Sequence, residues 1–170
     1  MPGDISKISQ LPNSPAVYGL YAGKGRRIRP AYVGLAGRLR QRIKQHLISR
    51  DSTVTLETAP IRLNPEALTE VRWWTHLSFK RKRVLRAAEL VAFEVLDPGL
   101  RSRGFPEGRA LLLSKKKSFR QRMTALFRAK PSGKMPLHTS ESLAEQVVDL
   151  ELRVSSLEQK MRPIKRQNRH

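Results

Sequence analysis

The sequence predicts a small domain of mixed α and β structure, of the α+β class. We expect a three-stranded, mainly antiparallel sheet flanked by helices, followed by a basic extension and a C-terminal coiled-coil helix. Two short β-prone runs near the N-terminus are joined by a basic, glycine-containing turn, and two later stretches repeat apolar residues at helical spacing. A heptad pattern near the C-terminus is the third observation. With 170 residues, the chain has room for one ordinary domain and an appendage.

The first two predicted strands form a hairpin. Residues 17–21 and 31–34 are short apolar runs, and the turn between them contains Gly23-Lys24-Gly25-Arg26-Arg27 and ends at Pro30. A third strand is predicted over 71–77, where side chains alternate between two faces. One face would carry Val71, Trp73, Thr75 and Leu77, and the other Arg72, Trp74 and His76, of which Trp74 is either packed or close to a nucleic acid.

Two helices are predicted around this sheet. Apolar residues recur at helical spacing from Leu35 to Leu47, which predicts a helix from Leu35 to about Ser49. Residues 51–68 contain Pro60 and Pro65 and are expected to form a loop with one short helix. A long helix is predicted over 80–96, and it should end at Asp97-Pro98-Gly99 because proline cannot continue the hydrogen-bond ladder.

The composition changes after the second helix. No acidic residue occurs between Glu107 and Glu141, and the segment between them is basic, with a linker at 131–136. We therefore expect an N-terminal tail (1–13), a globular domain (14–112), a basic extension with a linker (113–138), a coiled-coil helix (139–165) and a short tail (166–170).

The C-terminal heptads predict a homodimer. Leucines occupy the d positions and valines the first two a positions, a choice that favours parallel two-stranded coils. In this register Arg153 at g faces Glu158 at e of a second chain. A single amphipathic helix packed on the domain is the alternative. The residues expected at the interface are Leu143, Val147, Leu150, Val154, Leu157 and Met161.

The charge indicates a polyanionic partner. The chain has 34 basic and 14 acidic residues and a formal net charge of +20, so nucleic acid is the leading partner class and an anionic membrane surface the weaker one. The absence of cysteine excludes disulfides, cysteine–zinc sites and cysteine nucleophiles. No apolar run has the length of a membrane span, and no signal peptide is visible, so we expect a cytoplasmic protein that is not bound to a membrane.

Three polar residues on the predicted helices are candidates for chemistry. Glu89 lies at the edge of an apolar helix face, where a carboxylate is costly unless it binds a cation or an arginine. It is therefore a candidate ligand for a hard divalent metal or a partner in a salt bridge. Arg42 and His46 are four residues apart on one helix face. Arginine suits phosphate oxygens and histidine can supply a proton, although a solvated basic face is the simpler interpretation.

The order of these residues resembles the GIY-YIG nuclease family. Ala16-Val17-Tyr18 and Tyr32-Val33-Gly34 stand where the family has its two tripeptides, Arg42 follows Gly34 by eight residues, and Glu89 precedes Pro98 by nine. The resemblance covers about residues 14–100. Ala16 replaces the first glycine of the family pattern, and Leu100 and Arg101 stand where many members have an asparagine. A histidine one helical turn after the arginine, here His46, is similar to the restriction-enzyme branch of the family.

The resemblance implies a divalent-metal-dependent DNA endonuclease that hydrolyses phosphodiester bonds, with one Mg²⁺ or Mn²⁺ per site. Glu89 would hold the metal, Arg42 would neutralise charge on the transition state, and Tyr18 would activate water or relay its proton, helped by Tyr32 or His46. A tyrosine has an ordinary pKa near 10, so a tyrosine that acts as a base near pH 7 needs a cationic field to lower its pKa. Simple cross-strand packing is the alternative role for the two tyrosines. Residues expected to supply the field are Lys24, Arg26, Arg27, Arg38 and Arg40.

Double-stranded DNA is the expected substrate, and a dimer would bring two active sites to it. The alternatives are a non-catalytic nucleic-acid-binding protein that retains the fold, and a repair or recombination nuclease that nicks DNA within a larger assembly. A basic-zipper protein is disfavoured because Pro131 and Pro136 interrupt a continuous helix. Besides the five residues of the cationic field, the predicted DNA contacts are Lys80, Arg81, Lys82, Arg83, Lys115, Lys116, Lys117, Arg120 and Arg122.

Overall fold

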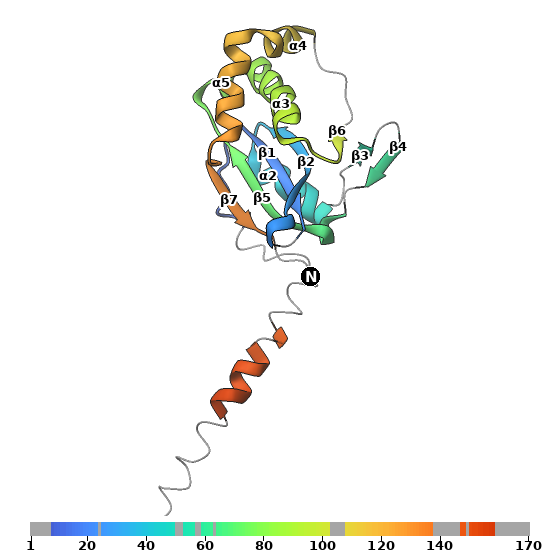
Figure 1. Cartoon of the computed structure of the whole chain (residues 1–170), viewed down its shortest axis with the longest axis vertical. Coiled ribbons are helices and arrows are strands. Elements are labelled where there is room, and N and C mark those ends of the chain that lie inside the picture. The colour runs from blue at the N-terminus through green and yellow to red at the C-terminus, as the bar shows by residue number, and fades with distance from the viewer. Residues whose placement is uncertain are drawn as a thin grey trace, which may run out of the picture.

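A four-stranded antiparallel sheet in the order β2-β1-β5-β7 forms the centre of the α+β domain in the computed structural model (Figure 1). Its strands are β1 (Ala16–Ala22), β2 (Arg29–Ala36), β5 (Leu68–Trp74) and β7 (Gly133–Pro136). The structure describes residues 8–23, 25–49, 53–56, 59–62, 64–102, 108–137, 147–148 and 150–158. The N-terminal hairpin is present as predicted, and a 3₁₀ turn (Gly25–Arg27) lies between its strands.

The sheet has one strand more than the sequence predicted. The expected linker at 131–136 includes β7, which pairs with β5 so that Met135 lies opposite Val71. Gly133 is required there because a Cβ atom at this position would lie 2.2 Å from Cζ2 of Trp73. A four-residue segment with a proline at its end resembles a linker in sequence, but the free edge of β5 gives its backbone a partner.

Side chains of β1 alternate between two buried faces. On one face Tyr18, Leu20 and Tyr32 pack with helix α2 (Leu39–Lys44) and with the π-helical turn that continues it (Gln45–Ser49). On the other face Val17 and Trp74 pack with helices α3 (Lys82–Leu96) and α5 (Lys117–Arg128), and α4 (Gly108–Lys115) lies against α3. Figure 1 shows α3, α4 and α5 together on one side of the sheet.

The first predicted helix begins later than expected. Leu35 and Ala36 belong to β2, where they pair with Val17 and Ala16, and the helix starts at Leu39. Its first amide groups are satisfied by the preceding chain, since Leu39 and Arg40 donate to the carbonyls of Ser14 and Pro12, each at 3.3 Å. The predicted apolar stripe of Leu39, Ile43 and Leu47 is buried.

The segment expected to be a loop contains a hairpin. Strands β3 (Thr53–Leu56) and β4 (Ala59–Arg62) pair antiparallel, and β6 (Arg101–Ser102) joins them in a second sheet with the order β4-β3-β6. A 3₁₀ turn (Pro65–Ala67) stands at the predicted short helix. The hairpin was missed because Pro60 suggested irregular chain, although proline is tolerated in an edge strand such as β4.

The third predicted strand and the long helix are joined by a short turn. The strand ends at Trp74 rather than at residue 77, and a 3₁₀ turn (Leu77–Lys80) precedes α3. The predicted alternation is confirmed, since Val71 and Trp74 lie in the cores on opposite faces. The helix ends at Leu96 as predicted, with Asp97 in the left-handed region at φ 46°.

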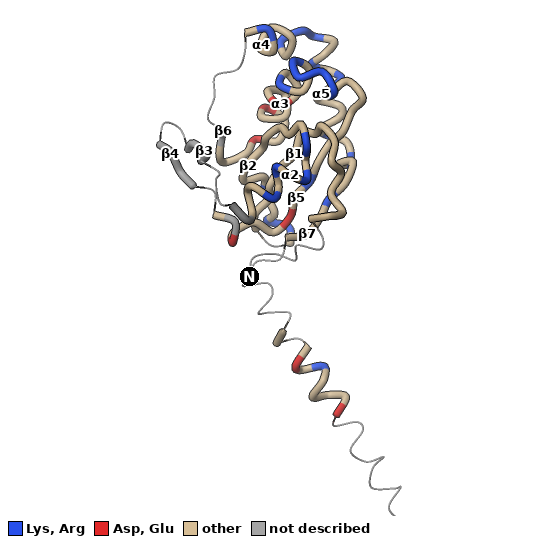
Figure 2. The backbone as a smooth tube through the Cα atoms, turned by 180° about the vertical axis from the view of Figure 1, so that it is seen from behind, with Lys and Arg blue, Asp and Glu red and all other residues tan. Residues whose placement is uncertain are grey.

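The segment predicted as a basic extension packs into the domain. Phe119, Met123 and Phe127 of α5 are buried, and the ring of Phe127 lies edge-on to Trp74 with centroids 5.7 Å apart. The lysines and arginines of α4 and α5 are exposed. Figure 2 shows these residues as blue segments of the backbone at this end of the domain.

The C-terminal helix leaves its apolar side chains exposed. It includes residues 147–148 and 150–158 and extends from the domain (Figure 1). Val147, Leu150, Val154 and Leu157 are 52%, 55%, 52% and 59% exposed. This exposure disagrees with the alternative of a helix packed on the domain. Leu143 and Met161 lie outside the described residues. Within the described ranges, no helix combines the length and apolarity needed to cross a membrane.

Candidate active site

The hairpin brings Tyr18 and Tyr32 together on the face covered by α2. Tyr18 lies opposite Gly34, and Tyr32 opposite Leu20, so the two tyrosines are diagonal neighbours with ring centroids 6.1 Å apart. A Cβ atom on Gly34 would lie 2.9 Å from each tyrosine hydroxyl. Glycine in the Tyr-Val-Gly sequence therefore allows both hydroxyl groups to lie directly over the β2 backbone.

His46 completes a cluster of three rings. The hydroxyl oxygen of Tyr18 lies 2.5 Å from Nε2 of His46, and the His46 ring is 5.7 Å from the ring of Tyr18 and 5.4 Å from that of Tyr32. Burial, and secondarily the charge of Arg42, lower the pKa of His46 to about 3. His46 is therefore neutral at pH 7, and its Nε2 shares a hydrogen bond with the Tyr18 hydroxyl whose direction is set by the imidazole tautomer.

Arg42 is the cation that acts on both tyrosines. Burial raises the pKa of Tyr18 well above its ordinary value and also raises the pKa of Tyr32, while Arg42 opposes both shifts. Burial lowers the pKa of Arg42 itself, but its proximity to Tyr18 and Tyr32 raises it, and the net direction is upward. The guanidinium therefore stays charged beside the two hydroxyl groups.

The expectation that a surface field lowers the pKa of Tyr18 is wrong. Desolvation has the largest effect, and the net shift is upward. Arg26, Arg27, Arg38 and Arg40 are exposed, and Nε of Arg40 donates to the carbonyl of Leu11 at 2.9 Å. Water screens exposed charges strongly, so they have little influence on a buried hydroxyl. Lys24 lies outside the described residues.

Glu89 reaches this cluster at the edge of the sheet. It comes from α3, which packs on the opposite face, but β2 is an edge strand, and the backbone amide of Leu35 donates to the Glu89 carboxylate there. Burial raises the pKa of Glu89 to about 7, although the Leu35 amide, Arg86 and Arg42 oppose the shift. The charge of Glu89 in turn raises the pKa of Tyr32. These effects place Glu89 near Tyr32 and Arg42, so one candidate site contains Glu89 together with Arg42 and the three rings.

The donor set fits a divalent ion with a single protein carboxylate. Among the described residues, no group of three or more histidine, cysteine or acidic side chains could enclose a metal. Mg²⁺ commonly binds through one or two carboxylates and completes its shell with water and substrate phosphate oxygens. A half-buried carboxylate whose pKa is raised to about 7 is incompletely compensated by the protein, and a cation would favour its ionised form.

Leu100 stands where the family pattern has an asparagine. Its amide donates to the carbonyl of Ala31 at 2.9 Å, and it forms a parallel bridge with Tyr32. Leu100 also packs against the core that contains Tyr18 and Tyr32. It supports the β2 edge through its backbone and an apolar contact. The side chain of Arg101 is outside the described part of the chain.

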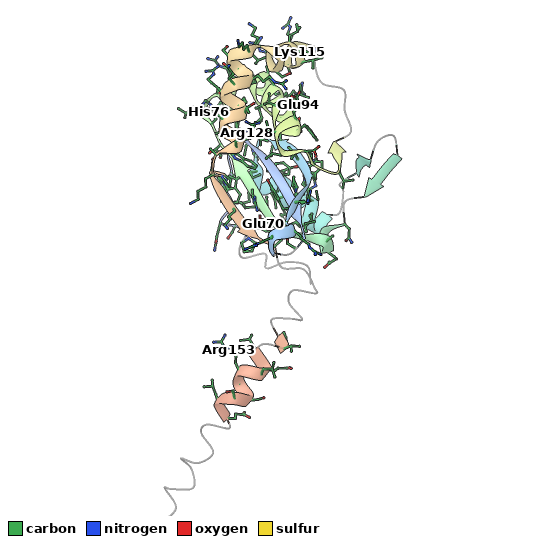
Figure 3. The ribbon with its side chains drawn as sticks, viewed as in Figure 1. Glu70, His76, Glu94, Lys115, Arg128 and Arg153 are labelled. Carbon is green, nitrogen blue, oxygen red and sulfur yellow. The ribbon has the colours of Figure 1, made fainter. Side chains whose placement is uncertain are left out.

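The predicted DNA contacts outside the cationic field are exposed. Lys80–Arg83 lie at the start of α3, and Lys115–Lys117, Arg120 and Arg122 lie on α4 and α5. Arg120 forms an ion pair with Glu94 of α3. Lys115 is the last residue of α4 and Arg128 the last of α5, and Figure 3 labels both together with Glu94 of α3.

Two features of the site were missed in the sequence. Gln45 contacts Arg42, and its position three residues later on the same helix face was the available signal. The amide of Leu35 contacts Glu89, and no sequence signal indicates a backbone donor at a sheet edge.

No family model, curated protein or solved structure matches the chain.

Proposed function

We propose that this protein is a divalent-metal-dependent DNA endonuclease of the GIY-YIG type. The observation that carries the proposal is that Glu89, at the β2 edge, lies near enough to Arg42 and Tyr32 for their charges to act on one another, beside the Tyr18–His46 contact. A carboxylate, a guanidinium and hydroxyl groups linked to a neutral imidazole are the groups that hydrolysis of a phosphodiester requires.

Arg42 and Glu89 have complementary roles in this proposal. The Arg42 guanidinium would bind a non-bridging phosphate oxygen and stabilise the charge that develops during attack. Glu89 would hold Mg²⁺ or Mn²⁺, which would supply Lewis-acid stabilisation of the phosphate and the leaving oxygen. Glu89 and Arg42 lie on different elements, so the sheet edge fixes their separation.

The Tyr18–His46 pair would handle the proton. In the free protein both groups are neutral, because burial disfavours tyrosinate and imidazolium alike. The charge of Arg42 is the second cause of the low His46 pKa. A phosphate bound to Arg42 would offset that charge and make His46 a better acceptor for a proton passed through Tyr18. Substrate binding would thus prepare the base.

Binding to DNA would be largely electrostatic. The net charge is +20, and the lysines and arginines of the α3 start and of α4 and α5 are exposed. Contacts from such side chains to phosphates release counterions, so affinity should fall steeply with salt. These surfaces would hold duplex DNA without selecting its sequence.

A second copy of the chain would cover the C-terminal helix. The stripe of Val147, Leu150, Val154 and Leu157 follows the a and d spacing of a two-stranded coil, and each of these side chains is more than half exposed. A dimer would bring two active sites to one duplex, as a double-strand cut requires.

The central experiment is cleavage of supercoiled plasmid with and without Mg²⁺ or Mn²⁺. Wild type should convert it to open-circular or linear forms only with metal, whereas Glu89→Gln and Arg42→Ala should be at least about a hundredfold slower. Glu94→Gln is the matched control, because Glu94 is an exposed carboxylate of the same helix. It should cut at close to the wild-type rate.

Other outcomes would identify a different function. Metal-independent binding to DNA, without cleavage of supercoiled, linear, nicked or branched substrates, would support a non-catalytic nucleic-acid-binding protein. Accumulation of open circles without linear product would support a nicking nuclease. Equal cleavage by wild type and Glu89→Gln would contradict the proposed site.

A further inference from the structure

Gln45 contacts the guanidinium of Arg42 from the first position after α2. Its side chain is half-buried, and Oε1 accepts a hydrogen bond from Nη1 of Arg42 at 3.3 Å. The contact lies beside the ring cluster, because the residue after Gln45 is His46, which is a member of that cluster.

The backbone at Gln45 is unusual. The α-helix ends at Lys44, and the amide of Gln45 donates to the carbonyls of both Gln41 and Arg42 before the π-helical turn Gln45–Ser49. Short π-helical segments are rare and occur often at functional sites. The change of helix type thus falls between Arg42 and His46, the two helical residues of the site.

The partners of Arg42 are electrically neutral when the tyrosines are protonated. Its guanidinium lies beside the Tyr18 and Tyr32 hydroxyls and the amide oxygen of Gln45. Among the described residues it forms no ion pair with a carboxylate within 4 Å, although Glu89 lies near enough for Arg42 to lower its pKa. A long, flexible side chain is thereby oriented by groups that leave its positive charge uncancelled.

We propose that Gln45 is a positioning residue for Arg42, whose neutral amide oxygen orients the guanidinium toward the substrate phosphate without neutralising it. The inference rests on the proposed nuclease function, because it gives Arg42 the task of binding a scissile phosphate. It adds a chemical requirement at residue 45, namely a hydrogen-bond acceptor without charge.

Two substitutions separate the acceptor from its charge. Gln45→Met removes the acceptor and keeps the side-chain length, whereas Gln45→Glu keeps an acceptor but adds a negative charge beside Arg42. Gln41→Met and Gln41→Glu are the matched controls, because Gln41 is an exposed glutamine one turn earlier on α2.

The first readout is the kinetics of plasmid cleavage with saturating Mg²⁺. We expect kcat to fall about tenfold in Gln45→Met and about a hundredfold in Gln45→Glu, with KM within about threefold of wild type, because the lost interaction acts in the transition state. The Gln41 variants should keep kcat within about twofold. Wild-type kcat in both Gln45 variants would overturn the inference, as would equal losses in the Gln41 variants.

The second readout does not need cleavage. In ¹⁵N NMR spectra of the guanidinium groups, an oriented Arg42 should give separate Nη signals, assigned by their loss in Arg42→Lys. These signals should merge in Gln45→Met and persist in Gln41→Met. Unchanged Arg42 signals in Gln45→Met would overturn the inference.

The two readouts distinguish failure of this inference from failure of the proposed function. If wild type cuts no DNA but the Arg42 signals depend on Gln45, the nuclease proposal fails and the positioning contact stands. If wild type cuts DNA and neither kcat nor the signals depend on Gln45, the nuclease proposal stands and the positioning role fails. Thermal melting of each variant establishes that it is folded at the assay temperature.

Discussion

The hydroxyl oxygen of Tyr18 lies 2.5 Å from Nε2 of His46, joining a sheet strand to the helical segment that covers it. Both side chains are buried, at 0% and 1% exposure. Burial disfavours the charged form of each, so the pair is held neutral in the free protein. This contact connects the stability of the fold to the protonation of the proposed active site.

His46 should make the protein sensitive to acid. Its pKa is lowered from 6.5 to about 3 on folding, so the unfolded chain binds the proton more tightly. The contribution of His46 to stability is complete above pH 6.5 and is lost as the pH falls toward 3. The free energy of unfolding should fall by up to about 4 kcal/mol over this range. His46→Gln keeps an acceptor for Tyr18 but does not titrate, so its free energy of unfolding should fall less between pH 7 and pH 4. Urea titrations monitored by circular dichroism measure this difference, and equal losses in the two proteins would contradict it.

Glu89 should destabilise the metal-free protein at neutral and higher pH. Its pKa is raised from 4.5 to about 7 on folding, so the folded state binds the proton more tightly. The contribution of Glu89 to stability is therefore greatest below pH 4.5, falls as the pH rises to about 7, and is constant above that. Glu89→Gln should raise the free energy of unfolding at pH 8 by about 2 to 3 kcal/mol and change it little at pH 4.5. Glu94→Gln, which alters an exposed ion pair, should change it by less than about 1 kcal/mol. A loss of stability in Glu89→Gln at pH 8 would show that the carboxylate is fully compensated by the protein.

Metal binding should depend on the same proton. A divalent ion requires ionised Glu89, so binding should strengthen as the pH rises through about 7 and level off above it. Mg²⁺ or Mn²⁺ should raise the melting temperature of wild type more at pH 8 than at pH 6, and should have little effect on Glu89→Gln. Differential scanning calorimetry with a metal titration measures both effects. An equal shift in Glu89→Gln would place the ion elsewhere.

Gly34 should be intolerant of a side chain. A methyl group there would lie 2.8 Å from Cε1 of Tyr32 and 2.9 Å from the Tyr18 hydroxyl, so one ring must move. Gly34→Ala should lower the free energy of unfolding by about 1 to 3 kcal/mol and reduce metal-dependent cleavage. Gly37→Ala is the control, because a Cβ atom there has no neighbour within 4 Å. Similar melting temperatures for the two variants would show that the ring cluster accommodates the methyl group.

The C-terminal helix should control the oligomeric state through one of its faces. Leu150 and Leu157 occupy d positions of the predicted coil, whereas Leu152 is 67% exposed and lies outside the a and d stripe. Leu150→Lys with Leu157→Lys should convert a dimer into a monomer in sedimentation velocity, and Leu152→Lys should remain a dimer. A monomeric wild type at micromolar concentrations, or a dimer that survives the double substitution, would contradict the coiled coil.

Local periodicity was sufficient for much of the fold. The stripe of Leu39, Ile43 and Leu47 predicted a buried helix face, and the end of α3 followed from Asp97 and Pro98, because these features depend on neighbours within a few residues. Helix α2 begins four residues later than predicted because Leu35 can satisfy either a helical period or a strand. Leu35 belongs to a strand because it pairs with Val17 of β1.

The residues proposed for chemistry could also be named from the sequence, since the spacing of Tyr18, Tyr32, Arg42 and Glu89 is a property of the chain. The sequence by itself thus determined the α+β class, the candidate side chains and the strong positive charge. The tertiary structure decided that Glu89 lies within electrostatic range of Arg42 at the β2 edge, that burial raises the pKa of Tyr18, that Gln45 contacts Arg42, and that β7 completes the sheet. The physical reason is that helical and strand periods are set by adjacent residues, whereas desolvation and strand pairing depend on segments that are distant in the chain.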